Sequence, residues 1–203
     1  MDRLARALLD QLDRWRSVLC LPLSWCLRLT DQQVLIDGDV EHWLEVLGVN
    51  DGLHGLHSLL YAFGEFRALY YHRLANGNAA GALAARLARR IWKPTESLTI
   101  RTVSIGPGLF IAHGQATCIA AETMGKGCYV HQGVTIGWGY RGRRAPVVGD
   151  GVFIGAGAAI LGEVTIGDGA RIGANAVVLC DVPPGATAVG SPARVLERVP
   201  STL

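Results

Sequence analysis

Residues 148–182 read VGDGVFIGAGAAILGEVTIGDGARIGANAVVLCDV, and this stretch repeats one unit of six residues. Every sixth position is aliphatic, and these positions are Val148, Ile154, Ile160, Ile166, Ile172 and Val178. A second small or β-branched residue stands four residues after each of them, and glycine often follows the aliphatic residue. An α-helix needs a spacing of about 3.6 residues, and a lone amphipathic strand needs about 2. A fixed period of six, broken by glycine, predicts a solenoid of short strands and tight turns with one aliphatic side chain pointing inward per repeat.

The repeat continues toward the N-terminus with a change of register. Two further runs keep the step of six, namely Ile105, Ile111 and Thr117, and then, shifted by one extra residue, Met124, Val130 and Ile136. Ile136 and Val148 are twelve residues apart, and the residues between them include the sequence WGYRGRR at 138–144, which is typical of a loop. We therefore expect this loop to leave the coil, where an exposed loop on a rigid scaffold can contact a ligand.

The composition indicates a folded chain without an electrostatic preference for nucleic acid. Half of the 203 residues are apolar, 26 are glycine, and the net charge is +2 with scattered basic residues. The cysteines are five in number and form no Cys-x-x-Cys pair, so we expect buried free thiols and no disulfide framework or metal site. The apolar run 18–27 contains Pro22, is too short to span a bilayer and has no cleavage pattern of a signal peptide. The expected location is the cytoplasm.

The first 93 residues are predicted to form a helical domain. Apolar residues at helical spacing run from Leu4 to Leu19, and Pro22 ends that helix or starts the next one. Three further helical segments are expected, at 42–47, 56–74 and 79–92. This domain is expected to pack against the end of the solenoid and against other subunits, because a terminal coil leaves open strand edges.

Four segments of the solenoid region resemble the bacterial serine O-acetyltransferases of the hexapeptide-repeat superfamily. They are IGPGLFIAHG from Ile105, VHQGVTIG from Val130, PVVGDGVFIGAGAAILG from Pro146 and DVPPGATAVGSPAR from Asp181. The resemblance covers residues 98–196 and implies a left-handed parallel β-helix, a homotrimer or dimer of trimers, and acetyl-CoA bound between neighbouring subunits. The left hand follows from the resemblance alone, because parallel crossovers are normally right-handed.

The predicted fold class is therefore α+β. Residues 1–93 are expected to form an α-helical packing and oligomerisation domain. Residues 94–192 are expected to form the β-helical catalytic domain, and residues 193–203 a C-terminal tail.

His113 is the candidate catalytic residue. Moving an acetyl group from a thioester to a hydroxyl requires a base that takes the hydroxyl proton and an acid that protonates the departing thiolate. One imidazole can do both. By the resemblance, His113 occupies the catalytic position, next to Gly114 where the coil turns. A lone histidine more often has a structural role, but the surrounding motif favours catalysis.

The chain departs from the family pattern at three positions. Ala112 stands where the serine acetyltransferases carry an aspartate before the catalytic histidine. Ala145 stands where they carry a second histidine in the loop, although the neighbouring Arg144 is retained. The carboxylate that orients the catalytic imidazole falls near residues 98–99, where no acid stands. These departures weaken the case for free serine as the acceptor and leave the case for acyl transfer intact.

Candidate residues for the acceptor site are His131, Arg144 and Glu122. His131 follows His113 by eighteen residues, which is about one coil. Strands of successive coils stack about 4.8 Å apart, so we expect the two rings on nearby faces. For His131 the favoured interpretation is a structural ring at a seam between subunits, and a role in acceptor binding is the alternative. Glu96 and Glu122 are the candidates for the carboxylate that orients His113.

Small residues indicate where acetyl-CoA runs along the coils. The pantetheine arm is a narrow amide chain, and small residues leave backbone N–H and C=O groups approachable. The candidates are Gly155, Ala156, Gly157, Ala158 and Ala176. Tight packing of the coils requires the same residues. By the resemblance Arg194 meets a CoA phosphate, with residues 141, 143 and 144, all arginines, as competitors. No metal is expected, and no nucleotide-binding glycine motif is present.

These observations predict an acetyl-CoA-dependent O-acetyltransferase that acts on a sugar hydroxyl, as in surface polysaccharides, or on another hydroxylated metabolite. The loop and the VHQGVTIG segment are similar to relatives that acetylate sugars. The alternative is a serine O-acetyltransferase that makes O-acetylserine for cysteine biosynthesis. An alternative of another class is a non-catalytic hexapeptide-repeat assembly protein, which would lose the base. A zinc hydratase on such a solenoid would need three histidines, and the solenoid sequence has only His113 and His131.

Overall fold

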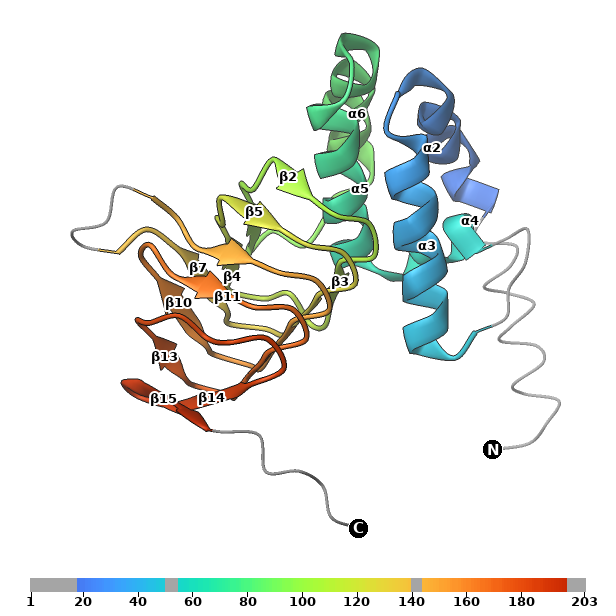
Figure 1. Cartoon of the computed structure of the whole chain (residues 1–203). Helices are drawn as coiled ribbons and strands as arrows, with labels where there is room; N and C mark the ends of the chain where they lie inside the picture. The colour runs from blue at the N-terminus through green and yellow to red at the C-terminus, as the bar shows by residue number, and fades with distance from the viewer. Residues whose placement is uncertain (1–17, 50–54, 140–143, 197–203) are drawn as a thin grey trace, which may run out of the picture. The chain divides into compact units, whose positions relative to one another are not determined.

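The computed structural model describes residues 18–49, 55–139 and 144–196 of the chain (Figure 1). The chain divides into two compact units, Met1–Thr95 and Glu96–Leu203, of which the first is helical and the second is built from short strands. The predicted helix between Leu4 and Leu19 falls mostly outside the described residues. Within the described ranges, no helix is long and apolar enough to cross a membrane.

The helical unit contains short 3₁₀ and α-helical turns followed by longer helices. In chain order they are η1 (Val18–Cys20), α2 (Leu21–Trp25), η2 (Cys26–Leu29), α3 (Gln33–Leu47), α4 (Gly55–Ala62), α5 (Gly64–Asn76) and α6 (Ala79–Ile91). Pro22 lies in the first turn of α2, where its missing N–H costs nothing. Asn78 caps α6, because its side chain accepts a hydrogen bond of 2.9 Å from the Gly81 N–H.

The single helix predicted over residues 56–74 is wrong, because the structure has two helices there. Phe63 separates α4 from α5 in an extended conformation. The Arg67 guanidinium donates hydrogen bonds to the carbonyl oxygens of Leu60 and Tyr61, at the end of α4. An arginine that satisfies terminal carbonyls stabilises a helix end. Periodicity alone does not show this break, since apolar residues continue through it.

A buried ion pair joins α3 to α5. The Arg73 guanidinium donates two hydrogen bonds to the Asp39 carboxylate, of 2.9 Å from Nε and 3.0 Å from Nη2. Both residues are almost fully buried. Trp43, also on α3, packs edge-on against Phe63 and Phe66 with ring centroids 5.6 and 5.2 Å apart. Aromatic packing and a bidentate ion pair therefore hold these helices together.

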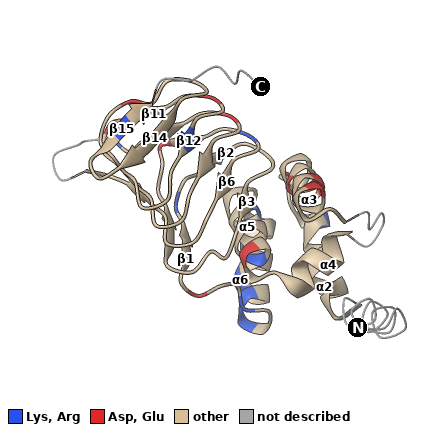
Figure 2. Ribbon diagram, turned by 90° about the horizontal axis from the view of Figure 1, so that it is seen from below, with Lys and Arg blue, Asp and Glu red and all other residues tan. Residues whose placement is uncertain are grey.

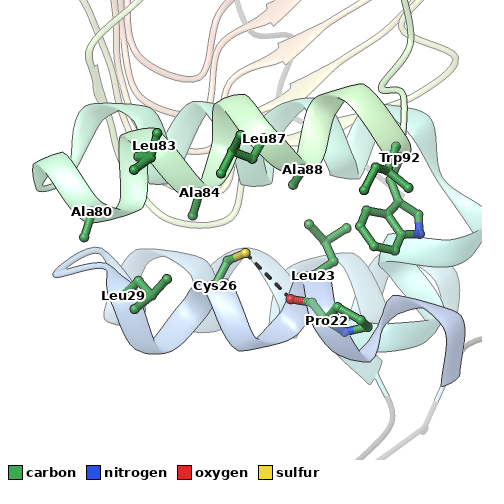
Figure 3. A pocket seen from close by; sticks show the side chains of 11 residues that line it. Pro22, Leu23, Cys26, Leu29, Ala80, Leu83, Ala84, Leu87, Ala88 and Trp92 are labelled. Carbon is green, nitrogen blue, oxygen red and sulfur yellow. Dashed lines mark hydrogen bonds between the residues drawn. The ribbon is translucent and has the colours of Figure 1, made fainter.

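An apolar groove of about 400 Å³ lies between α6 and the segment formed by α2 and η2 (Figure 3). Its lining residues are Pro22, Leu23, Cys26, Leu29, Ala80, Leu83, Ala84, Leu87, Ala88, Ile91 and Trp92. The Cys26 thiol donates to the Pro22 carbonyl at 3.7 Å, and burial raises the pKa of this thiol. Apart from this thiol the lining offers no acid or base, so we place no chemistry in this groove.

The second unit is a parallel β-solenoid of three sheets (Figure 1). We call them sheets A, B and C. Sheet A contains β1 (Leu98–Ile100), β4 (Thr117–Ile119), β7 (Thr135–Gly137), β10 (Ala159–Leu161) and β13 (Val177–Val178). Sheet B contains β2 (Ser104–Ile105), β5 (Thr123–Met124), β8 (Val147–Val148) and β11 (Thr165–Ile166). Sheet C contains β3 (Phe110–Ile111), β6 (Tyr129–Val130), β9 (Phe153–Ile154), β12 (Arg171–Ile172), β14 (Thr187–Gly190) and β15 (Ala193–Leu196).

The step of six residues is confirmed as the inward series of the coils. From Val148 to Val178 every sixth residue is at most 2% exposed. The predicted series Ile105, Ile111 and Thr117 is wrong at its last position. The inward aliphatic residue of β4 is Ile119 and not Thr117. Ile119 pairs in register with Ile136 of β7, and Thr117 lies two residues before it. The extra residues therefore precede Ile119, whereas the sequence placed the register shift after Thr117.

Aspartate side chains stabilise the corner between sheets B and C. Asp150 Oδ1 accepts a hydrogen bond of 3.0 Å from the Lys126 N–H, and Asp168 Oδ1 accepts one of 2.8 Å from the Asp150 N–H. Gly151 and Gly169 follow these aspartates with φ values of +61° and +64°, a region that favours glycine. Aspartate and glycine at the ends of the hexads thus build a corner that repeats from coil to coil.

The register also locates the loop between β7 and β8. Phe153 and Arg171 are partners on neighbouring coils, 18 residues apart, whereas Tyr129 and Phe153 are 24 residues apart. Six additional residues thus lie in the coil that contains 138–144. Residues 140–143 of this loop lie outside the described residues.

The solenoid ends in a hairpin. The described residues of the expected C-terminal tail, Ala193–Leu196, form β15, which pairs antiparallel with β14. Figure 2 shows charged residues scattered along the ribbon of the solenoid, whereas acidic residues gather on α3 and basic ones on α6.

Candidate active site

His113 lies at the corner that leads from sheet C to sheet A, which we call the C–A corner. It follows β3, its side chain is exposed, and its φ is +52°. A residue other than glycine rarely adopts this region, and such conformations gather at functional sites.

This corner is two residues longer than the same corner of the next coil. Ile111 pairs with Val130 and Cys118 pairs with Thr135, so seven residue steps on the first coil correspond to five on the second. The additional residues make a small bulge that carries His113. Within it the Gln115 N–H donates to the His113 carbonyl, which closes a three-residue turn.

His131 lies on the neighbouring coil, one position away from the place that its spacing predicted. Because Ile111 is opposite Val130, the register places His131 beside Ala112. After the bulge the Gly133 N–H donates to the Gln115 carbonyl, which aligns Gln132 with Gln115. The His131 ring is half-buried, with its centroid 5.0 Å from that of Tyr129 and 5.4 Å from that of Phe153. The two histidines are thus at one corner, and the His131 ring packs against aromatic side chains.

The two other acceptor-site candidates lie at a different corner. Glu122 and Arg144 are both exposed, and they flank the turns between sheets A and B, at the other end of sheet A from His113. The Glu122 N–H donates to the Pro146 carbonyl at 2.8 Å, so the A–B turn of one coil contacts the residues that follow the loop in the next coil. A single chain does not bring these side chains to His113.

The positions at which the chain departs from the serine acetyltransferase pattern are buried. Ala112, Ala145 and Leu98 are 8%, 7% and 9% exposed. Glu96 is exposed and lies two residues before Leu98. Within the described ranges the His113 ring makes no hydrogen bond and no ion pair with any of these residues or with another carboxylate.

The candidate CoA-binding residues continue the C–A corner along the solenoid. The Gly157 N–H donates to the Gln132 carbonyl at 2.9 Å, and the Asn175 N–H donates to the Ala156 carbonyl at 2.8 Å. Successive corners therefore stack below His113. Ala156 is half-buried and Gly157 exposed, so their backbones are accessible.

Other members of this set are required for packing. Ala158 and Ala176 are fully buried, so their methyl groups fill the core of the coil. A Cβ at Gly155 would stand 2.7 Å from the Ala174 nitrogen, so this position needs glycine whether or not a ligand binds. Asn175, which the sequence analysis did not single out, adopts a φ of +57° beside Gly157.

Arg194 lies on β15 and is exposed, opposite Val189 of β14. Arg144 is also exposed, and residues 141 and 143 lie outside the described residues. In the part of the chain that the structure describes, no three His, Cys, Asp or Glu side chains are grouped to hold a metal ion.

The cysteines differ widely in accessibility. Cys180 is exposed, whereas Cys128 is fully buried and its thiol donates to the Gly149 carbonyl at 3.2 Å. Burial is the main reason that the pKa of Cys128 rises to about 11. At pH 8 about one thousandth of such a thiol is the reactive thiolate.

We therefore expect iodoacetamide at pH 8 to label Cys180 and to leave Cys128 unmodified until the pH approaches 11. The thiolate fraction grows tenfold with each pH unit below the pKa, so labelling of Cys128 should rise steeply above pH 9. Peptide mass spectrometry after a timed reaction measures both sites. Equal labelling of Cys128 and Cys180 at pH 8 would contradict the burial argument.

Known proteins share both the repeat and the fold. The family model for the bacterial transferase hexapeptide (six repeats) matches residues 145–180. Comparison with curated protein sequences gives no match. Among solved structures, the soybean serine acetyltransferase apoenzyme is 32% identical with a TM-score of 0.64, and the match covers 81% of this chain and 69% of the soybean chain.

Two further structures show ligands. The serine acetyltransferase of Neisseria gonorrhoeae, solved in complex with serine, is 30% identical with a TM-score of 0.61, over 85% of this chain and 73% of that one. A serine acetyltransferase solved in complex with CoA is 28% identical with a TM-score of 0.61, over 86% of this chain and 74% of that one.

These matches confirm the predicted architecture of N-terminal helices followed by a left-handed parallel β-helix. They extend over most of this chain and over more than two thirds of the soybean and Neisseria enzymes. The protein belongs to the serine acetyltransferase family of hexapeptide-repeat enzymes, which are acyl-CoA-dependent O-acyltransferases.

Proposed function

We propose that the protein transfers an acetyl group from acetyl-CoA to the hydroxyl of a small acceptor, with His113 as the catalytic base. The observation that carries this proposal is the exposed imidazole on the bulged C–A corner, at the head of a line of small-residue corners. A relative solved with CoA supports acyl-CoA as the donor.

In the proposed reaction, His113 removes the proton from the acceptor hydroxyl while the oxygen attacks the thioester carbonyl carbon of acetyl-CoA. The tetrahedral intermediate collapses, the C–S bond breaks, and the imidazolium returns the proton to the CoA sulfur. The products are the O-acetyl ester and free CoA, and the histidine ends neutral. A single histidine therefore completes the proton balance without a metal.

L-Serine is the first acceptor that we propose. A serine acetyltransferase related to this chain was solved with serine, which favours serine over the sugar acceptor that the sequence analysis placed first. A larger hydroxylated acceptor such as a sugar is the second candidate. It is favoured by one observation, namely that alanine occupies positions 112 and 145, where the resemblance implies polar partners for serine.

The stacked corners after His113 are the proposed path of the pantetheine arm, with the Ala156 and Gly157 backbones as its polar contacts. The coils stack along the solenoid axis, so we propose that the extended pantetheine arm lies parallel to that axis, over these corners. Arg194 is the proposed partner of a CoA phosphate, because its guanidinium is exposed near the last coil.

The direct test is to incubate the purified protein with acetyl-CoA and single acceptors and to follow the release of free CoA with a thiol reagent. L-Serine, homoserine and a panel of sugars form the acceptor set, and mass spectrometry identifies the acetylated product. Release of CoA that no acceptor accelerates would contradict the proposed function.

We also expect the active protein to be a trimer or a dimer of trimers. His113 and the pair Glu122 and Arg144 lie at opposite ends of sheet A, so one chain offers only part of a site. A neighbouring subunit would bring the second corner to the first. Light scattering combined with an activity assay over a dilution series measures this, and a stable, fully active monomer would refute it.

A further inference from the structure

Thr117 is a buried threonine at the C–A corner, four residues after His113. Thr117 is 1% exposed. Its Oγ1 lies 3.3 Å from the Gln115 carbonyl oxygen and 3.3 Å from the His131 carbonyl oxygen. A hydroxyl donates one hydrogen, so it serves the two acceptors in turn. The hydroxyl thereby links the bulge that carries His113 to the next coil.

A hydroxyl is unexpected at this place in the coil. The register of sheet A aligns Thr117 with Val134, Ala158 and Ala176, which are all apolar and completely buried. Burying a hydroxyl in an apolar core is unfavourable unless it finds hydrogen-bond partners. Valine has nearly the same shape as threonine and would follow the pattern of the repeat. The polar residue therefore occurs at the one of these four corners that carries the candidate base.

The bulge also has little else to fix the imidazole. His113 and Ala116 both have positive φ values, +52° and +53°, which residues other than glycine rarely adopt. Within the described residues the His113 ring has no hydrogen-bond partner. The orientation of the base must then come from its backbone. That backbone is held on one side by the Ala112 N–H, which donates to the Val130 carbonyl at 2.8 Å.

On the C-terminal side of His113, the backbone of the bulge is held at Gln115. The Gln115 carbonyl accepts hydrogen bonds from the Gly133 N–H at 2.9 Å and from the Thr117 hydroxyl at 3.3 Å. The Gln115 N–H in turn donates to the His113 carbonyl. The chain of contacts from the Thr117 hydroxyl to the His113 backbone is therefore short and continuous.

We propose that Thr117 is a positioning residue, whose buried hydroxyl fixes the bulge in the conformation that aims the His113 imidazole at the acceptor hydroxyl. The proposal rests on the proposed role of His113 as the base. Among the described residues no carboxylate contacts His113 to orient its ring. In this proposal, hydrogen bonds from the core orient it instead.

The test compares Thr117→Val with Thr117→Ser. The valine variant keeps the shape and loses the hydroxyl, and we expect kcat to fall about ten- to hundredfold, as for a catalytic group displaced by roughly 1 Å. The KM for acetyl-CoA should stay within about twofold, since the donor does not contact Thr117. The serine variant restores the hydroxyl and should restore kcat to within about threefold of the unaltered protein.

Thr102 provides a matched control. It is also buried, at 2% exposed, and its hydroxyl donates to the Ile119 carbonyl at 3.4 Å, away from the His113 bulge. Thr102→Val should therefore lower the thermal stability to a similar degree and leave kcat unchanged.

A pH profile gives a second measurement on Thr117→Val. The profile of kcat should keep its shape in this variant, because His113 remains the base.

Three results would overturn the proposal. They are an unchanged kcat in Thr117→Val, an equal loss of kcat in Thr102→Val, and a loss of kcat that Thr117→Ser does not restore. If the valine variant does not fold, Thr117→Cys takes its place, since a thiol is a weak donor and should also lower kcat. The acceptor is L-serine, or the fastest substrate of the panel. Activity that survives in His113→Ala would instead contradict the role of His113 as the base, and CoA release that no acceptor accelerates would contradict acetyl transfer, so these failures are distinguishable from that of the Thr117 proposal.

Discussion

Replacing His113 by alanine is expected to lower kcat for acetyl transfer by about 10²–10⁴-fold, which is the usual contribution of a general base. The expected loss follows from the mechanism, since the acceptor hydroxyl is far too weak an acid to lose its proton unaided at neutral pH. The exposed position of the side chain means that its removal leaves no cavity, so the fold and the assembly should persist. Steady-state kinetics with acetyl-CoA, together with circular dichroism and light scattering, measure both expectations.

A second variant separates the imidazole from its backbone. His113 has a φ of +52°, and asparagine tolerates this region better than alanine does. His113→Asn should therefore keep the shape of the corner and lose activity as fully as His113→Ala. His42→Ala is the matched control, because His42 lies on α3 of the helical unit and should be silent in the assay.

His131 is the residue to examine if the expectation is wrong. A His113→Ala variant that keeps more than about a tenth of the turnover would place the base elsewhere. His131 is the nearest alternative, because it stands on the next coil beside Ala112. Its ring contacts Tyr129 and Phe153, so a role in packing predicts a loss of stability from His131→Ala and little loss of kcat.

The solenoid was predictable from its sequence because each coil repeats the same local demands. An aliphatic residue points inward at every sixth position, and aspartate and glycine form the corners, so the pattern is visible without any long-range information. Thr117 shows where this reasoning fails. Thr117 follows Ile111 by six residues and is buried, so it fits the repeat. Only the strand register reveals that Ile119 is the residue aligned with Ile136.

The same limit explains the site. His113 was predictable as a candidate from its motif, yet the two-residue bulge that exposes it depends on the pairing of β3 with β6 and of β4 with β7. The role proposed for Thr117 depends on contacts with Gln115 and His131, which no local pattern encodes. In the helical unit, the break at Phe63 was missed for a similar reason, because the Arg67 side chain that caps α4 comes from the following helix.

Replacing Ala112 by aspartate is expected to raise kcat/KM for L-serine by roughly ten- to 150-fold. A hydrogen bond to a charged group contributes about 1.5–3 kcal/mol, and this range corresponds to that factor. The resemblance implies an aspartate at this position as the partner of the serine amine. Ala112 directly precedes His113 and lies beside His131, so a carboxylate placed there would be within reach of an acceptor held at the base.

The control is an acceptor without the amine. 3-Hydroxypropionate has the hydroxyl and the carboxylate of serine and lacks its ammonium group, so the gain from Ala112→Asp should not appear with it. An equal gain with both acceptors would mean that the new carboxylate acts on the His113 imidazole and not on the substrate. Ala112→Asn, which is uncharged, should give a smaller gain with serine than the aspartate does.

The same measurements decide between the two proposed acceptors. If the unaltered protein already turns over L-serine with kcat/KM at or above about 10⁴ M⁻¹s⁻¹, serine binds without the missing aspartate and other groups hold its amine. If serine is slow and one of the sugars is fast, Ala112 and Ala145 provide space for a larger acceptor, and Ala112→Asp should slow that sugar while it accelerates serine. A variant that accelerates neither acceptor would show that position 112 does not face the acceptor, and the argument from the missing acid would then fail.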